Sequence, residues 1–234
     1  MIETISILGK TISLYYLFWF FSMVAALITG YLLRKEYGYS FSQATIYVVM
    51  DLVFGYLLIW ATSWVFGGGR TIGFNFARIV SFVPLYFVLM AKVFKETLWK
   101  LADFLAPVGA FFFGTSHFGC IFTGCCHGYP SDWGLYSNEA QAICFPIQPI
   151  EAIASLLIGI VLFIMAKRKK QQGKLYVWFM ILFGSTRFVF EFFRDNQKIW
   201  HNISDLALHA LAAFVLGIAA LLIMKNPHRN EEEA

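Results

Sequence analysis

Seven long apolar runs, separated by short polar segments, follow one another along the chain. Each approaches the roughly 20 residues that a helix needs to cross the hydrocarbon core of a membrane. The runs cover residues 13–33, 43–66, 71–92, 101–125, 150–166, 175–194 and 205–224. They lack the short alternating segments that are typical of a membrane barrel. The pattern therefore predicts an all-α protein whose single membrane domain, residues 1–225, has seven transmembrane helices and is followed by a polar tail, residues 226–234.

Lysine and arginine are distributed unevenly between the two sets of connecting segments. Most lie in the segments that follow the first, third, fifth and seventh runs. Because cytoplasmic loops are enriched in these residues, we expect the N-terminus outside the cell and the C-terminus, with its tail, inside. The outer end of the fourth run and the loop 128–149 would then face the extracytoplasmic side.

The composition supports a membrane location. Hydrophobic residues make up 59% of the chain and charged residues only 14%, and the mean hydropathy is +0.66. A soluble domain carries about 25% charged residues. The net charge of +4 is small and scattered in short clusters, which gives no support to nucleic-acid binding. The first 12 residues show no cleavage site for a signal peptide, so we expect the first run to be retained as a helix.

Several charged residues interrupt the apolar runs. A charge at the bilayer centre costs at least about 2.5–3.5 kcal/mol on insertion scales, so each needs a partner or a polar cavity. Asp51 could pair with Arg78. Arg187 and Glu191 are four residues apart, hence on one helical face, and Arg194 follows one turn later. These three residues predict either a structural ion pair or a site for the phosphate of a lipid headgroup, because a guanidinium donates two hydrogen bonds at once to phosphate.

The segment 114–130, GTSHFGCIFTGCCHGYP, concentrates cysteine, histidine and glycine at the end of the fourth run. Its glycines could allow close packing of helices, which requires no chemistry. Its possible metal ligands are His117, Cys120, Cys125, Cys126 and His127. Their spacing matches no common zinc pattern, and adjacent cysteines ligate one ion awkwardly, so we expect no metal site.

The cysteines have two other interpretations. Thiols that face the extracytoplasmic side can form a lasting disulfide. Cys125 or Cys126 could therefore bridge to Cys120 or to Cys144 and fasten the loop 128–149. Alternatively, the four cysteines could carry a redox or thiol-transfer function.

Three segments resemble motifs of the prolipoprotein diacylglyceryl transferase family. HFGCIFTGCCHG at 117–128 is similar to the family signature R-I-G-N-F-x-N-G-E-x-x-G in its spacing and its glycines. FPIQPIEA at 145–152 resembles H-P-x-Q-L-Y-E-A, and FGSTRFVFEFFR at 183–194 resembles Y-G-x-x-R-F-x-x-E-x-x-R. The convincing resemblance covers about residues 114–194. The family also has seven spans with the N-terminus outside, as the charge distribution predicts here.

The sequence departs from the family pattern at several positions that are polar in the family. His117 replaces the signature arginine, Cys120 and Thr123 replace its two asparagines, and Cys125 replaces its glutamate. Phe183 replaces the tyrosine that precedes the arginine of the last motif. The last motif keeps its charged residues, whereas in the signature cysteine and histidine replace several of the family's residues. The chain resembles a divergent paralogue.

The resemblance implies a reaction and a set of roles. The family moves a diacylglyceryl group from phosphatidylglycerol to the cysteine thiol of a lipoprotein precursor, at the outer side of the bacterial plasma membrane, without a cofactor. The expected partners are thus an anionic phospholipid and a lipoprotein precursor or another thiol acceptor. The expected catalytic residues are His117, Arg187 and Glu191. The expected substrate-binding residues are Tyr15, Gln148, Glu151 and Arg194.

Two alternatives to this transferase remain. The chain could be a carrier of a small solute that contains a thiol or sulfur, with the cysteines along its path. It could also be a catalytically silent family member that binds lipid or a partner protein, because it has lost signature residues.

Overall fold

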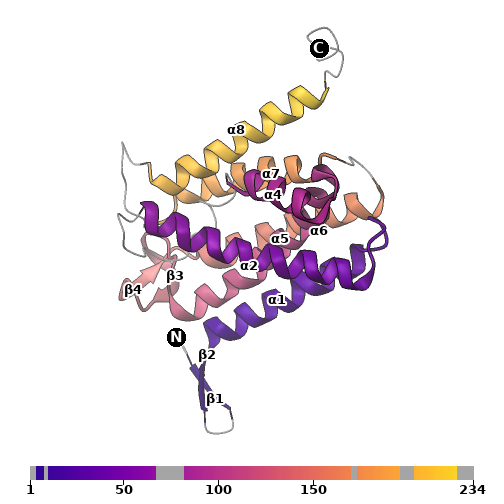
Figure 1. The fold of residues 1–234 in the computed structure, drawn as a ribbon. Helices are drawn as coiled ribbons and strands as arrows, with labels where there is room; N and C mark the ends of the chain where they lie inside the picture. The colour runs from indigo at the N-terminus through magenta and orange to yellow at the C-terminus, as the bar shows by residue number, and fades with distance from the viewer. Residues whose placement is uncertain (1–3, 8–9, 67–81, 170–172, 196–202, 226–234) are drawn as a thin grey trace.

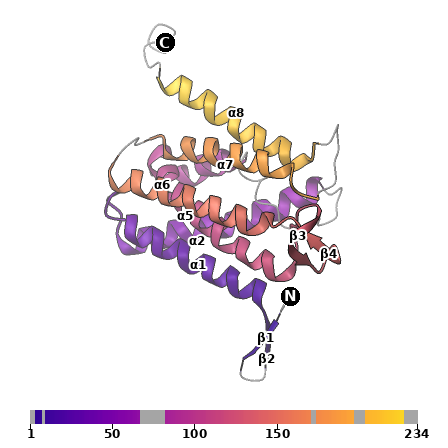
Figure 2. The same ribbon diagram turned by 180° about the vertical axis from the view of Figure 1, so that it is seen from behind.

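The computed structural model describes residues 4–7, 10–66, 82–169, 173–195 and 203–225. Within them the chain forms a bundle of helices with two small hairpins (Figure 1). The helices are α1 (Leu14–Leu33), α2 (Phe41–Phe66), α4 (Val83–Phe94), α5 (Leu98–Thr123), α6 (Ile147–Lys167), α7 (Leu175–Glu191) and α8 (Asp205–Lys225). Seen from behind, the bundle proceeds from α1 through α5 and α6 to α7 and α8 (Figure 2).

Five of the described helices are long and apolar enough to cross a membrane. They are α1, the Phe41–Thr62 part of α2, α5, α6 and the Asp205–Met224 part of α8. The described part of the third predicted span is the shorter helix α4, and α7 is 17 residues long. The structure therefore confirms several helices that are long and apolar enough to cross a membrane, and the count of seven spans and their orientation stay predictions.

Two β-hairpins add to the predicted helices. β1 (Thr4–Ile7) pairs with β2 (Lys10–Ser13), and this antiparallel hairpin projects away from the bundle (Figures 1 and 2). β3 (Pro130–Ser137) pairs with β4 (Ala142–Cys144) inside the segment that the sequence analysis described only as a loop. The first hairpin has a visible signal, because TISI and KTIS alternate polar and apolar residues with the period of a strand.

Helix α5 is the centre of the bundle. Protein covers 61% of its most apolar stretch, against 22–39% for the other four candidate spans. Two glycines allow the close approach of its neighbours. A Cβ on Gly114 would lie 2.9 Å from a side-chain atom of Leu156 in α6, and one on Gly119 would lie 3.3 Å from the Cα of Tyr15 in α1. The glycines of this segment therefore do serve packing, as small residues commonly do between membrane helices.

A buried carboxylate of α5 fixes the start of α7. Asp103 is 1% exposed and accepts hydrogen bonds from the backbone N–H groups of Leu175 (2.8 Å) and Tyr176 (3.2 Å). The first N–H groups of a helix have no partner within the helix, and the helix dipole favours a negative charge there. Asp103 thus anchors the helix that carries Arg187 and Glu191.

Candidate functional site

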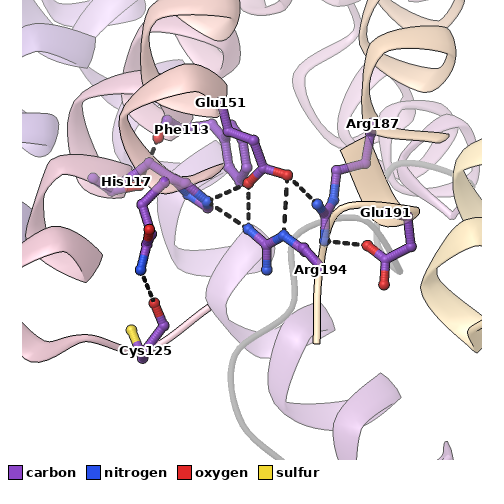
Figure 3. Close-up of polar contacts among 9 residues, drawn as sticks. Phe113, His117, Cys125, Glu151, Arg187, Glu191 and Arg194 are labelled. Atoms are coloured by element: carbon purple, nitrogen blue, oxygen red, sulfur yellow. Dashed lines mark hydrogen bonds and ion pairs between the residues drawn. The ribbon is translucent and has the colours of Figure 1, made fainter. Parts of the chain in front are cut away.

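Glu151 in α6 is the hub of a buried polar network (Figure 3). Its Oε1 accepts hydrogen bonds from Arg187 and, at 3.1 Å, from Nε of Arg194. Its Oε2 accepts from Nη2 of Arg194 and lies 2.6 Å from Nε2 of His117. All four residues are at most 7% exposed. The structure therefore brings together residues from three of the sequence motifs, with Glu151 at their centre.

Glu191 joins the network from the opposite side of Arg187. Its Oε2 lies 2.8 Å from Nη2 of Arg187, which confirms the pair expected from their four-residue spacing. Its Oε1 accepts a hydrogen bond from Oγ of Ser204 at 2.7 Å. The same Ser204 oxygen accepts from the backbone N–H of Ala207 at 3.1 Å, near the start of α8. The ion pair consequently ties α7 to α8.

Arg194 reaches the site by a different route from the one expected. The sixth apolar run was predicted to stay helical to residue 194, but α7 ends at Glu191. Residues 127–129 then pair with the chain that leaves the helix: Gly128 forms a β-bridge with Arg194, and Tyr129 N–H donates to the Phe193 carbonyl at 3.2 Å. This pairing places Nη2 of Arg194 at 2.9 Å from Nε2 of His117. Backbone pairing, and not helical periodicity, positions this side chain.

The charges of the network balance. Two guanidinium groups face two carboxylates inside an apolar bundle. An isolated buried charge is costly, whereas a paired and hydrogen-bonded one is tolerated. His117 Nε2 can donate to Glu151 or accept from Arg194, according to its tautomer. An incoming anion would therefore have to compete with Glu151 or share the arginines with it.

Three of the four cysteines gather beside this network. The sulfur atoms of Cys120, Cys125 and Cys126 lie within 4.8 Å of one another. All four thiols are free, and Cys144 lies in β4, where its thiol faces the carbonyl of Ala142 at 3.7 Å. Hydrogen bonds from the Cys120 and Cys125 thiols, helped by the positive charge of Arg194, lower the pKa of Cys126 well below its usual value. The structure thus groups three cysteines and does not join Cys144 to them.

Comparison with known proteins matches this arrangement to one family over nearly the whole chain. A family model described as "Prolipoprotein diacylglyceryl transferase" covers residues 3–224. The chain belongs to this family. The match includes the signature segment with its histidine and cysteines as well as the two motifs that carry Glu151 and the arginines.

Individual relatives within the prolipoprotein diacylglyceryl transferase family are distant. The phosphatidylglycerol–prolipoprotein diacylglyceryl transferase of Campylobacter curvus is 27% identical over an alignment of 215 positions that covers 86% of this chain and 78% of the relative. That of Campylobacter lari is 25% identical over a gapped alignment of 259 positions that covers 96% of this chain and 93% of the relative. An enzyme of the same name from Clostridium perfringens, numbered 2, is 27% identical over 114 residues.

Two expected substrate contacts of this family member have structural partners. The side-chain amide of Gln148 is buried and donates to the backbone carbonyl of Cys125 at 3.1 Å, so it holds the cysteine loop. Tyr15 in α1 packs against Gly119, the residue that precedes Cys120. Both residues therefore lie beside the cysteines.

Two contributors to the transferase-family site, Asp103 and Ser204, were not predicted from the sequence. Ser204 directly precedes an apolar run, where a serine is a common helix cap, so its position carried a signal. The expected pair of Asp51 with Arg78 cannot be placed, because Arg78 lies outside the described residues. Asp51 itself lines a largely apolar cavity of about 60 Å³, together with Tyr86 and Tyr176.

Proposed function

We propose that this chain is a membrane transferase of the phosphatidylglycerol–prolipoprotein diacylglyceryl transferase type. It would move a diacylglyceryl group from an anionic phospholipid to a thiol acceptor, such as a lipoprotein precursor, at the outer side of a bacterial plasma membrane. The observation that carries this proposal is the buried network of Glu151, two arginines and His117. Its members come from the segments that resemble the family motifs, and the family model spans them all.

The reaction makes defined demands on a site. The acceptor thiol loses its proton, its sulfur forms a bond with a carbon of the diacylglyceryl group, and the C–O bond to phosphate breaks. Glycerol phosphate leaves with the electron pair of that bond. The site must therefore favour a thiolate, because a thiol of pKa about 8.5 is a poor nucleophile. It must also stabilise the charge that develops on the leaving phosphate.

The arginines are suited to binding the leaving phosphate. Each guanidinium has five N–H donors in a planar fork, and such groups bind phosphate oxygens in pairs. Arg187 and Arg194 both donate to Oε1 of Glu151, which holds them close together (Figure 3). A phosphate that replaced or joined this carboxylate would meet both arginines without a large movement of the helices. Glu191 would keep the guanidinium of Arg187 oriented during this exchange.

His117 is suited to accepting the proton of the thiol. An imidazole titrates near neutrality, so it can accept the proton of a thiol and release it later. Its Nε2 lies 2.6 Å from Oε2 of Glu151, which can orient the ring for this transfer. His117 would thus take over part of the role that the signature arginine has in the family.

A mass-shift assay tests the proposal. Purified protein in detergent is mixed with phosphatidylglycerol and a peptide that contains one cysteine in a lipoprotein-type recognition sequence. We expect a diacylglyceryl shift that disappears in Arg187→Ala and persists in the matched control Arg34→Ala, whose arginine contacts only its own helix among the bonds described, through the Tyr31 carbonyl. Full activity of Arg187→Ala would contradict the assigned role.

The same assay separates transfer from simple binding. If the wild-type protein retains phospholipid through purification but causes no increase in the mass of the peptide, the network binds lipid without transferring it. The transferase proposal would then be wrong, and a lipid-binding member of the family would be the conclusion.

A further inference from the structure

The three grouped cysteines, Cys120, Cys125 and Cys126, have no part in the reaction proposed above. They lie where α5 ends: Cys120 is in its last turn, and the other two follow its capping residue Gly124. We propose that this cysteine cluster is a binding site for one thiophilic d10 metal ion, held by three thiolates. This inference goes beyond the proposed transferase and does not depend on it.

The separation of the sulfur atoms fits one ion. A metal–sulfur bond is about 2.3 Å long, so three sulfurs around one ion in a plane lie about 4.0 Å apart. The three sulfur atoms all lie within 4.8 Å of one another, and small rotations of the side chains would close the remaining gap. A disulfide between the adjacent Cys125 and Cys126 is disfavoured, because consecutive Cα atoms are about 3.8 Å apart and disulfides usually join Cα atoms at least about 4.4 Å apart.

The backbone conformation at Cys126 allows two adjacent cysteines to bind one ion, which the sequence pattern alone made unfavourable. Adjacent side chains of an extended chain point to opposite sides, which is why neighbouring cysteines ligate one ion awkwardly. Cys126 has φ 58°, in the left-handed region, and follows Gly124 at φ 72°. These turns place both sulfur atoms on the side of Cys120. A left-handed residue other than glycine costs about 1–2 kcal/mol, and such strain is concentrated at functional sites.

Hydrogen bonds hold the cysteine loop in this shape. The hydroxyl of Thr123 lies 3.2 Å from the sulfur of Cys125 and donates to it, and Gln148 donates to the Cys125 carbonyl at 3.1 Å. Oγ of Ser137 in β3 donates to the carbonyl of Gly124 at 2.7 Å. Metal sites are commonly supported by such contacts to the ligands and to their backbone. The loop is therefore tied to α6 and to the second hairpin before any ion binds.

The set of ligands favours a monovalent ion. Among the described residues the group contains three cysteines and neither a histidine nor a carboxylate. Structural zinc sites usually have four ligands, whereas soft thiolates select Cu⁺ readily. We therefore expect Cu⁺ to bind more tightly than Zn²⁺.

The test measures metal binding by the full-length protein in detergent. The protein is reduced, freed of reductant under anaerobic conditions, and titrated with Cu⁺ in competition with a chromogenic Cu⁺ chelator; a parallel titration uses Zn²⁺. We expect one Cu⁺ per chain and three sulfur neighbours at about 2.3 Å by X-ray absorption. Zn²⁺ binding at one per chain that exceeds Cu⁺ binding would contradict the three-ligand assignment, and absence of 1:1 binding of either ion would overturn the site.

Substitutions identify the ligands. Cys120→Ser, Cys125→Ser and Cys126→Ser should each weaken Cu⁺ binding by more than 100-fold, which exceeds the roughly 10–100-fold effect of losing a supporting contact. Cys144→Ser is the matched control and should bind like the wild type, because Cys144 lies outside the group. Equal binding by all four variants would overturn the proposal.

Two further variants distinguish a loss of Cu⁺ binding from misfolding and from a loss of transfer activity. Thr123→Val removes only the supporting hydroxyl and should weaken Cu⁺ binding by about tenfold. Arg187→Ala should still bind one Cu⁺ although it loses transfer activity. If transfer proves absent from the wild type while Cu⁺ binds, the transferase proposal fails and the metal site stands.

Discussion

The replacement Glu151→Gln tests whether the buried network is held together by its charge balance. The change keeps the size of the side chain and removes one negative charge. Arg187 would keep Glu191, whereas Arg194 would lose the carboxylate that accepts from both its Nε and its Nη2. Both arginines are at most 4% exposed, so water cannot replace the lost carboxylate.

The structure sets the size of the effect. Removal of one partner of a buried ion pair costs about 3–5 kcal/mol, chiefly because the other charge stays buried without compensation. The matched change Glu191→Gln should cost less, about 1.5–3 kcal/mol, which is the range for hydrogen bonds to charged groups. Arg187 would in that case still have Glu151 as an ion-pair partner, although it would share this carboxylate with Arg194. The expected order of destabilisation is therefore Glu151→Gln above Glu191→Gln.

A double variant isolates the charge term. In Glu151→Gln combined with Arg194→Met, the uncompensated charge is removed along with its partner, and an apolar side chain of similar length replaces the guanidinium. Pairs in direct contact show coupling energies of about 0.5–3 kcal/mol. We expect the double variant to be more stable than the sum of the single changes predicts, by at least about 1 kcal/mol.

The assay is reversible unfolding in mixed micelles with increasing dodecyl sulfate, followed by far-ultraviolet circular dichroism. This measurement is independent of transferase activity. The reasoning is refuted if Glu151→Gln changes the free energy of unfolding by less than about 0.5 kcal/mol, the range of ordinary surface substitutions. It is also refuted if Glu191→Gln proves the more damaging change, or if the single effects add.

Three other substitutions have expected outcomes. Asp103→Ala should lower the free energy of unfolding by about 1–3 kcal/mol in the same micelle assay, because it leaves buried N–H groups at the start of α7 without an acceptor. Gly128→Ala would place a methyl carbon 2.6 Å from a backbone oxygen and should lower transfer activity in the mass-shift assay, whereas Gly55→Ala, in open space, should not. Ser204→Ala should cost about 1 kcal/mol by unfolding, since it removes a bond to a buried carboxylate and a helix cap.

Most of the helices could be predicted because hydropathy alone determines them. A run of some twenty apolar residues leaves the backbone no partner but itself once it is in lipid. The observed ends of α1 and α8 lie within one residue of the predicted ends. The end of α7 could not be predicted in this way, because Phe192 and Phe193 continue the apolar pattern while the chain leaves the helix to pair with Gly128.

The candidate site could be predicted only in part. The pair of Arg187 and Glu191 follows from spacing on one helix, so sequence sufficed. The central position of Glu151 depends on how α6 packs against α5 and α7, and no local pattern encodes that packing. The grouping of the three cysteines depends on the left-handed conformation of Cys126. A positive φ is uncommon for residues other than glycine, so the sequence gives no signal for it here.

The contact between Glu151 and Arg187 also bears on how the protein enters the membrane during synthesis. Helix α7 carries both an arginine and a glutamate and would partition poorly by itself, whereas α6 is one of the most apolar of the candidate spans. The two helices are consecutive, and their side chains neutralise each other where they meet. The insertion machinery would therefore receive the two helices as one hairpin, and a variant without Glu151 should insert α7 less efficiently, because Arg187 would keep only Glu191 as a partner.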